Sequence, residues 1–321
     1  MRRYFTILAT TRDRSHGCVK TEPFKLRRRQ ISVASHVWRV FSVLFLLALP
    51  TWAQAKPTLI WLLRDLPPLT IFEGPKKGQG VIDQLLPQLI AGMPQYEHIL
   101  MRVNRARGTQ MLREQPFACD PSLIWNKERA QWLSFSIPAF RAVSNGLVVR
   151  QQDRQVLEPF MVNGEVDLTA FLADGKSKVG VVAERSYGEF LDTLLREAPT
   201  GSLLPHYGND ALSSLLSMQR LGRLQVVLGY WPEIDYQARQ AQIAEDELVL
   251  LQVKGTGKYL SGHIGCSGTA LGRQAIKEIN QLLRTLPHDS LNQRYADWLE
   301  PGRREDYLQQ ARIFFEQQAA H

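Results

Sequence analysis

Short apolar runs alternate with amphipathic segments along most of the chain, and this alternation limits the fold more than any other feature. Thr58–Leu63 is a nearly continuous apolar run of the kind that forms a strand buried on both faces. Residues 80–90 instead repeat apolar side chains at the spacing of a helix. Alternation of such strands and helices is typical of parallel sheets that helices cover on both sides. The sequence therefore predicts an α/β fold.

The same patterns place the other elements. Val- and Leu-rich runs predict further strands at 98–103, 117–119, 146–150, 178–182, 225–229 and 248–253. Helical spacing predicts further helices at 109–114, 210–221, 270–284 and 303–318, with Gly222 ending the second of these. Residues 167–176 are predicted to form a loop-rich join early in the second half.

The positive charge of the chain is concentrated at its start. The whole chain has 39 Lys and Arg against 31 Asp and Glu. Residues 1–55 hold ten of these bases and two of the acids, so 39 less 10 leaves 29 bases and 31 less 2 leaves 29 acids. A basic surface that could hold a nucleic acid is therefore not expected in the rest of the chain.

Residues 1–55 have the features of an export signal. A basic region that ends at Arg39 precedes ten apolar residues, and Ala53 and Ala55 form a small-x-small cleavage site. Ten helical residues span about 15 Å, half of a hydrocarbon core of about 30 Å, which argues against a membrane anchor. We expect cleavage near Ala55 and export to a periplasm. Because the basic region is unusually long, we expect translation to start downstream, near Val33 or Val37.

Two cysteines remain after this cleavage, Cys119 and Cys266, while Cys18 falls in the signal. An even pair in an oxidising compartment favours a disulfide. Two buried thiols are the alternative. A reactive thiol or a metal site is less well supported, because His263 near Cys266 has no matching pair of ligands elsewhere. We expect no cofactor and no metal.

The segment 121–140, PSLIWNKERAQWLSFSIPAF, holds one arginine, Arg129, before a Phe-Ser-Ile-Pro run. It resembles the stretch of bacterial extracellular solute-binding proteins of family 3 that reads as a Ser-rich turn, Thr-x-x-Arg and Phe-Ser-x-Pro. Weaker matches to the same family cover most of residues 57–300. These are residues 66–69 and 78–83, residues 179–182 with 186–188, residues 221–227, and residues 265–280 with Tyr295 and Trp298.

The resemblance implies a two-lobed periplasmic-binding-protein-like type II fold, with a mainly parallel sheet flanked by helices in each lobe. Lobe one would comprise residues 56–145 and 265–321, and lobe two residues 146–264. Cys119 and Cys266 would then both lie near the hinge on the side of lobe one, at positions that the resemblance implies are paired.

The resemblance also implies a ligand site between the lobes. Arg129 would clamp an anion, because its planar guanidinium suits a carboxylate or phosphate; a surface ion pair with Glu128 or Asp120 is the alternative. Ser186 and Glu189 fit a helix capping box, which either caps the helix or also presents amides to the cleft. The residues expected at the site are Asp65, Ser122, Trp125, Asn126, Arg129, Ser186, Tyr187, Tyr230 and Trp231. For the aromatic members, packing in the core is the alternative.

Three residues depart from the amino-acid binders of this family. Ile124 and Asn126 stand where those proteins usually have Ser or Thr, and Tyr230 stands where they have an acid for the ammonium group. The resemblance therefore implies a small anionic or polar ligand other than a standard amino acid.

The expected function is capture of this ligand for transport or sensing by a monomer, with a membrane permease or sensor as partner. One alternative is an enzyme on the same fold, such as a cyclic-acid dehydratase, with Asp65, Glu184 and His263 as its only candidate acids and bases. Another is a regulatory protein that has lost its ligand. The sequence lacks the phosphate-loop, nucleophile-elbow and zinc-protease motifs.

Overall fold

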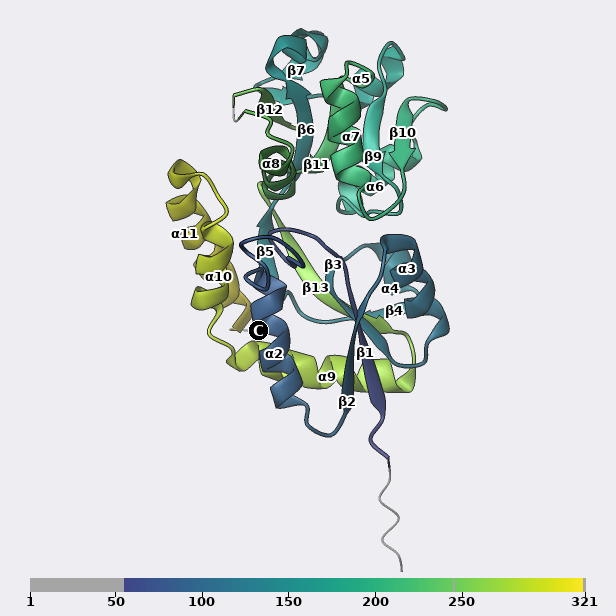
Figure 1. Cartoon of the computed structure of the whole chain (residues 1–321), viewed down its shortest axis with the longest axis vertical. Coiled ribbons are helices and arrows are strands. Elements are labelled where there is room, and N and C mark those ends of the chain that lie inside the picture. Colours follow the sequence, from purple (N-terminus) through teal and green to yellow (C-terminus); the bar gives the residue numbers. More distant parts are fainter. Residues whose placement is uncertain (1–54, 245, 320–321) are drawn as a thin grey trace, which may run out of the picture. The chain divides into compact units, whose positions relative to one another are not determined.

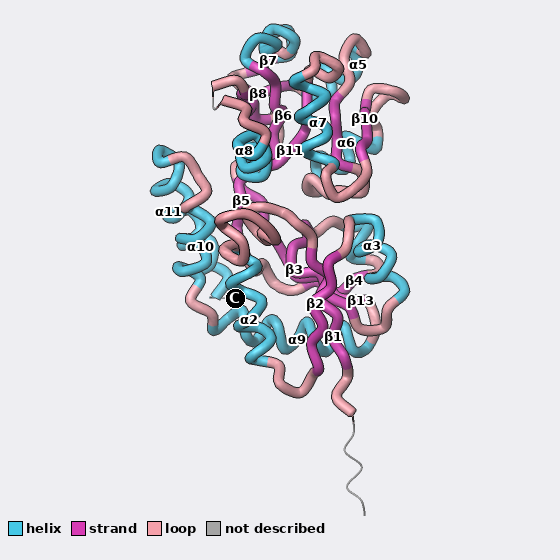
Figure 2. Tube along the Cα trace, viewed as in Figure 1, coloured by secondary structure: helices cyan, strands magenta, loops and turns pink. Residues whose placement is uncertain are grey.

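The computed structural model describes residues 55–244 and 246–319, and the expected export signal before Ala55 lies outside them. The strands form two large sheets and one two-stranded ribbon (Figure 1). We call the six-stranded sheet and its helices lobe one, and the five-stranded sheet and its helices lobe two. Helices alternate with strands along the chain, as the apolar patterns predict (Figure 2).

Lobe one is built on the strand order β2-β1-β3-β13-β4, with β5 also paired to β13. β1 runs parallel to β2 and β3, whereas β13 is antiparallel to β3, β4 and β5. The strands are β1 (Thr58–Leu63), β2 (Glu97–Arg102), β3 (Ala118–Ile124), β4 (Leu133–Phe135), β5 (Phe140–Val143) and β13 (Tyr259–Ser267). The helices are α2 (Val81–Gly92), α3 (Arg105–Glu114), α4 (Lys127–Ala130), α9 (Ala270–Thr285), α10 (His288–Ala296) and α11 (Pro301–Ala319).

Alternate residues of β1 enter different cores, which explains its nearly continuous apolar sequence. Leu59 and Trp61 pack with the apolar residues of α2, α9 and α10. Leu62 packs on the other face, with Met111 and Leu112 of α3. Helices therefore cover both faces of this sheet, as expected for a buried parallel strand.

Lobe two has the strand order β10-β9-β11-β6-β12. β9 is parallel to β10 and β11, and β6 is antiparallel to β11 and β12. The strands are β6 (Asn145–Arg150), β9 (Val179–Val182), β10 (Leu203–His206), β11 (Val226–Tyr230) and β12 (Leu248–Gln252), beside the ribbon of β7 (Met161–Val162) and β8 (Glu165–Val166). The helices are α5 (Leu168–Asp174), α6 (Glu189–Arg196), α7 (Ala211–Arg220) and α8 (Trp231–Gln240), with 3-10 turns η1 (Gln151–Val156) and η2 (Glu158–Phe160).

The loop-rich join predicted at 167–176 is wrong, because this segment contains the helix α5. The Asp167 side chain accepts a hydrogen bond from the Ala170 amide and so caps the start of the helix. Gly175 ends it in the left-handed conformation, at φ 68°. Phe171 and Leu172 are buried in the core of lobe two. The prediction was wrong because Asp167 and Gly175 are residue types typical of loops, but here they begin and end a helix.

The chain passes between the sheets twice, from β5 to β6 and from β12 to β13. At the first passage the Tyr295 hydroxyl accepts a hydrogen bond from the Val143 amide at 2.9 Å and bonds the buried Tyr230 hydroxyl. This contact ties β5, β11 and α10 together beside the passage.

The predicted disulfide is confirmed: Cys119 and Cys266 are bonded and lie opposite each other on β3 and β13. Both residues are fully buried. The bridge therefore joins strands of lobe one that are 147 residues apart in sequence.

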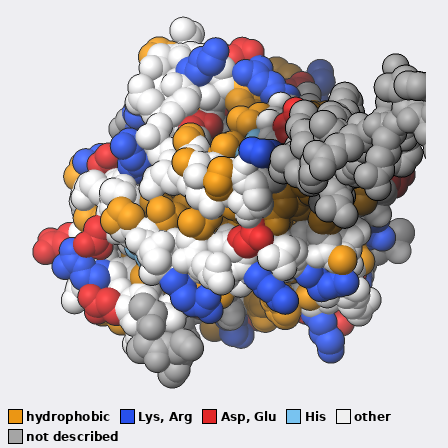
Figure 3. All heavy atoms as spheres, turned by 90° about the horizontal axis from the view of Figure 1, so that it is seen from below, with side chains coloured by type: hydrophobic (Ala, Val, Ile, Leu, Met, Phe, Trp, Pro, Cys, Tyr) orange, Lys and Arg blue, Asp and Glu red, His pale blue; other side chains and the backbone are white. Residues whose placement is uncertain are grey.

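Within the described residues, no helix combines the length and apolar character needed to span a membrane. Acidic and basic side chains are interspersed over the face seen in Figure 3. Across residues 55–244 and 246–319, no group of three or more His, Cys, Asp or Glu is placed to hold a metal ion.

Candidate functional site

A small cavity of about 50 Å³ is lined by residues of both lobes. Lobe one contributes the cationic side chains Arg105 and Arg129, and lobe two contributes Arg185. No acidic side chain is among the described residues that line it. The remaining lining residues are Leu66, Leu69, Ser122, Leu123, Ile124, Phe140, Ala142, Val143, Asn145, Ser186, Tyr230 and Leu260. We call this space the central cavity.

Arg105 is the first residue of α3, which begins just after β2. The Asn104 side chain caps this helix by accepting a hydrogen bond from the Arg107 amide at 2.8 Å. Within the described part of the chain, the Arg105 guanidinium has no hydrogen bond and no ion pair. Burial lowers the pKa of Arg105 well below its usual range, and the nearby Arg64 and Arg185 lower it further. An anion here would therefore be strongly favoured.

Arg64 follows β1 directly and lies beside this cavity, buried against Asp120 of β3. Its guanidinium forms two hydrogen bonds with the Asp120 carboxylate. It also donates to the Ser122 hydroxyl at 3.0 Å. Asp120 in turn accepts bonds from the Ser122 amide and hydroxyl at 2.9 and 3.0 Å. Arg64 is thus neutralised by a carboxylate whose own bonding is complete.

Arg185 lies beyond the end of β9, and its side chain is only 8% exposed. Its Nη2 atom is 2.6 Å from an oxygen of Glu233, which is equally buried. Burial is the largest single effect and lowers the pKa of Arg185, but the charge and hydrogen bond of Glu233, together with Tyr187 and Tyr230, outweigh it, so the net shift is upward. The second guanidinium nitrogen, Nη1, is buried without a hydrogen-bond partner. Arg185 therefore has its charge balanced but retains a free donor.

Arg129 lies on the short helix α4, capped by the Asn126 side chain, which accepts from the Arg129 amide at 2.8 Å. Its Nη2 atom donates to the Glu184 carbonyl of lobe two at 3.1 Å. Burial, followed by the charge of Arg64, lowers the pKa of Arg129. The surface ion pair with Glu128 or Asp120 is not formed. Arg129 borders the central cavity, and no carboxylate of the described residues is bonded to it.

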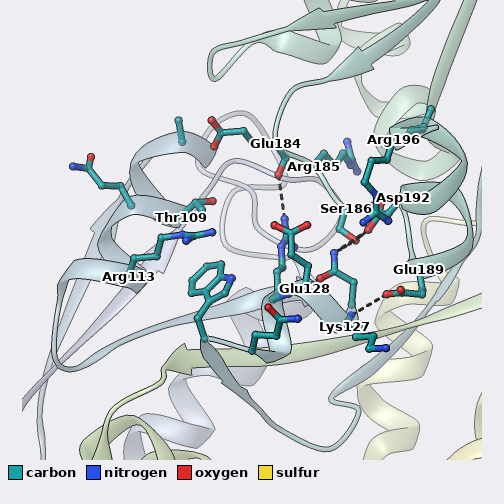
Figure 4. A pocket seen from close by; sticks show the side chains of 17 residues that line it. Thr109, Arg113, Lys127, Glu128, Glu184, Arg185, Ser186, Glu189, Asp192 and Arg196 are labelled. Atoms are coloured by element: carbon teal, nitrogen blue, oxygen red, sulfur yellow. Dashed lines mark hydrogen bonds between the residues drawn. The ribbon is translucent and has the colours of Figure 1, made fainter. Parts of the chain in front are cut away.

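A second cavity of about 800 Å³ shares Arg129, Arg185 and Ser186 with the central one and extends between α3, α4 and α6 (Figure 4). Two carboxylates of α6 reach across to α4. Asp192 accepts a hydrogen bond from the Asn126 side chain at 2.9 Å, and Glu189 accepts one from the Lys127 amide at 2.9 Å. These contacts hold the two lobes together beside the central cavity.

The predicted capping box is wrong, because Glu189 bonds lobe one instead of the start of its own helix. α6 begins at Glu189 with Gly188 as its N-cap. Asp192 takes the expected role of Glu189: its carboxylate accepts from the Tyr187 amide at 2.7 Å and from the Ser186 hydroxyl at 2.5 Å. The positive φ of Gly188, 99°, displaces the helix start by two residues from Ser186.

Comparison with known proteins gives matches in structure only: no protein-family model and no curated protein matches the sequence. One similar structure is an amino acid ABC transporter substrate-binding protein from Streptococcus pneumoniae bound to L-arginine, 16% identical, with a TM-score of 0.56 over 76% of this chain and 94% of that one. Another is the periplasmic VFT2 domain of BvgS from Bordetella pertussis, 18% identical, with a TM-score of 0.55 over 76% and 94%. A third is a histidine kinase sensor domain with similarity to periplasmic binding proteins, 14% identical, with a TM-score of 0.59 over 77% and 97%.

The chain has the periplasmic-binding-protein fold. This confirms the two-lobed α/β architecture that the resemblance implies. At these identities the likeness establishes the fold only. The ligand has to be inferred from the residues that line the cavity.

In this periplasmic-binding-protein fold, only part of the predicted site comes together. Ser122, Arg129, Ser186 and Tyr230 line the central cavity, and Asn126 lines the 800 Å³ cavity beside it.

The other predicted residues lie elsewhere. Asp65 lines a cavity of about 340 Å³ that shares Arg105 with the central one. Tyr187 is fully buried in lobe two, where its hydroxyl accepts a bond from the Val182 amide. Trp125 is 43% exposed. Trp231 lines a separate cavity of about 520 Å³ and donates to Glu300.

The candidate acids and bases of an enzyme do not share a cavity. Asp65 lines the 340 Å³ cavity and Glu184 the 800 Å³ cavity. The His263 ring lies 2.8 Å from the Ser136 carbonyl, and burial lowers its pKa. Nothing in their placement provides a paired acid and base.

Sequence reasoning missed Arg64, Arg105 and Arg185, although a signal was present. Each follows within three residues of a strand that ends at Leu63, Arg102 or Val182. These strands run parallel to their neighbours, and ligands of open α/β sheets bind beyond the carboxyl ends of such strands. An arginine just after each of three parallel strands was therefore a usable sign of an anion site.

Proposed function

We propose that this protein is a periplasmic binding protein that closes its lobes on a small anion and presents it to a membrane permease or sensor. The observation that carries the proposal is Arg105, a partly buried arginine that has no partner among the described residues and lies beside a cavity that none of their acidic side chains lines. A buried charge without a counter-charge is costly. A bound anion would remove that cost, so this site favours an anionic ligand.

Closure follows from the two-sided construction of the cavity. Arg105 and Arg129 belong to lobe one, and Arg185 and Ser186 to lobe two. A ligand that contacts both lobes binds the closed state better and so shifts the equilibrium toward it. We propose that residues 56–145 and 259–321 move as lobe one and residues 146–258 as lobe two. The bound differs from the expected 146–264 because residues 259–264 belong to β13, which pairs with β3 and β5 of lobe one.

The ligand is proposed to be other than a standard amino acid. Tyr230, at the position expected for an ammonium partner, uses its hydroxyl to bond Tyr295. Carboxylates whose charges act on Arg105 and Arg129 are already bonded, Glu233 by Arg185, Asp120 by Arg64 and Asp192 by Ser186 and Asn126. None of these three is left without a partner for an ammonium group to take up. We further propose a monomer without a bound cofactor.

The first test is a thermal-shift panel on the purified protein, with small anions, cations and neutral solutes at constant ionic strength. A ligand at about 100 times its Kd adds about 2.7 kcal/mol to stability. For a protein of this size that should raise Tm by about 5–10 °C. We expect such a shift with at least one anion and with no cation.

The panel includes a control for the general stabilising effect of some salts, which does not depend on a site. Arg105→Gln should lose most of the shift, whereas Arg107→Gln, which alters an exposed arginine of α3 that hydrogen-bonds Gln110, should keep all of it. A general salt effect would remain in both variants. If no anion raises Tm, or if only cationic or neutral solutes do, the proposed function is wrong.

A further inference from the structure

The charges around the central cavity are not balanced. Of the four arginines in and beside it, Arg64 is paired with Asp120 and Arg185 with Glu233. Within the described residues, Arg105 has no hydrogen-bond or ion-pair partner, and Arg129 bonds only a carbonyl oxygen. Asp192, Asp120 and Glu128 lie near enough to offset the charge of Arg129 in part, but none of them bonds it. Two guanidinium groups are therefore left without a bonded carboxylate, and a ligand with a single charge could pair with only one of them.

The cavity is too small for most organic dianions. A buried water requires about 10–15 Å³ of such space. The 50 Å³ available thus accommodates about three to five water-sized groups. A tetrahedral oxyanion, with four oxygens around one centre, is of this size.

Two buried atoms of lining residues lack partners and define the hydrogen bonds that a ligand should make. The Nη1 donor of Arg185 needs an acceptor, and its side chain is more than nine-tenths buried. The Oδ1 acceptor of Asn145 needs a donor, since the Nδ2 of the same amide is used by the Tyr187 carbonyl at 3.2 Å. Leaving such groups unsatisfied is costly. The ligand should therefore offer several acceptors and one hydroxyl.

We propose, resting on the anion-binding function above, that the ligand is a tetrahedral oxyanion with two negative charges and one remaining hydroxyl, that is, hydrogen phosphate. Its charge matches Arg105 and Arg129. Its ionised oxygens accept from these arginines and from Nη1 of Arg185, and its hydroxyl donates to Oδ1 of Asn145. Sulfate has the same shape and charge but no hydroxyl, so it would place an oxygen against the Asn145 acceptor.

The test is isothermal titration calorimetry of the purified protein with hydrogen phosphate, sulfate, acetate and malonate, at one pH and one ionic strength. Phosphate should bind at least about tenfold more tightly than sulfate, because a site built around a substrate hydroxyl rejects the analogue that lacks it. It should also bind more tightly than acetate, which carries one charge. Phosphate affinity should rise with pH as the dianion replaces the monoanion.

A variant tests the role of Asn145. Asn145→Leu removes the acceptor and should narrow the ratio of phosphate to sulfate affinity, whatever its effect on absolute affinity. If this variant does not fold, the ratio of phosphate to sulfate affinity of the unaltered protein still tests whether the site recognises the hydroxyl.

The outcomes separate this inference from the proposed function. Equal binding of sulfate and phosphate contradicts the hydroxyl contact. Tighter binding of acetate or malonate contradicts a compact dianion but leaves anion capture intact. Heat with none of the four, together with no response in the thermal-shift panel, overturns both.

Discussion

Replacing both bridged cysteines, as Cys119→Ala with Cys266→Ala, should lower the free energy of unfolding by about 5 kcal/mol. The disulfide closes a loop of 147 residues, and a cross-link of that length restricts the unfolded chain strongly. The loss is large because whole domains are stable by only about 5–15 kcal/mol. Urea unfolding followed by circular dichroism measures it.

Reduction provides the control for this experiment. Dithiothreitol should destabilise the unaltered protein by a similar amount and should leave the double variant unchanged, because that variant has no bridge to reduce. If the double variant loses less than about 1 kcal/mol of its free energy of unfolding, the loss is no larger than that of an ordinary substitution. That result would show that the bridge contributes little to stability.

Glu233→Gln should lower the free energy of unfolding by about 3–5 kcal/mol, because it leaves the buried Arg185 without its counter-charge. The same change raises the number of guanidinium groups at the central cavity without a bonded carboxylate from two to three. Anion binding should therefore become tighter, while the ligand-free protein becomes less stable. Phosphate should then restore part of the lost free energy of unfolding. Urea unfolding with and without phosphate measures both effects.

Asp235→Asn is the matched control on the same helix. Asp235 pairs with Arg239 one turn away, at the surface of α8. Exposed pairs of this kind contribute about 0–1 kcal/mol, so this variant should unfold almost as the original does. If Glu233→Gln is as mild as Asp235→Asn, Arg185 is not held in the buried arrangement described.

Periodicity predicted most of the fold because burial dictates it. Leu59, Trp61 and Leu62 enter cores on opposite faces of one sheet, and that requirement is visible as an apolar run. The helix α5 was missed for a related reason. Its polar cap at Asp167 and its end at Gly175 resemble a loop, and only seven residues lie between these signals.

The site was harder to predict because its chemistry depends on pairing between distant residues. Arg64 pairs with Asp120, 56 residues later in the sequence, and Arg185 pairs with Glu233, 48 residues later. No local sequence pattern therefore reveals which arginines are neutralised. Arg129 was found from the resemblance, yet its guanidinium bonds the Glu184 carbonyl. Arg105 belongs to no local motif, and its importance follows only from the absence of a partner in the folded protein.

We propose that the guanidinium of Arg105, which has no partner among the described residues, holds an anion in the central cavity. Calorimetric titration of Arg105→Gln with the tightest anion of the panel tests it most directly, beside Arg107→Gln as the control on the same helix. Loss of charge-assisted hydrogen bonds should weaken binding by about a hundredfold or more. Tm of the empty protein should stay level or rise, because an unpaired buried charge has been removed. Unchanged affinity in Arg105→Gln, with both variants folded, would contradict the account.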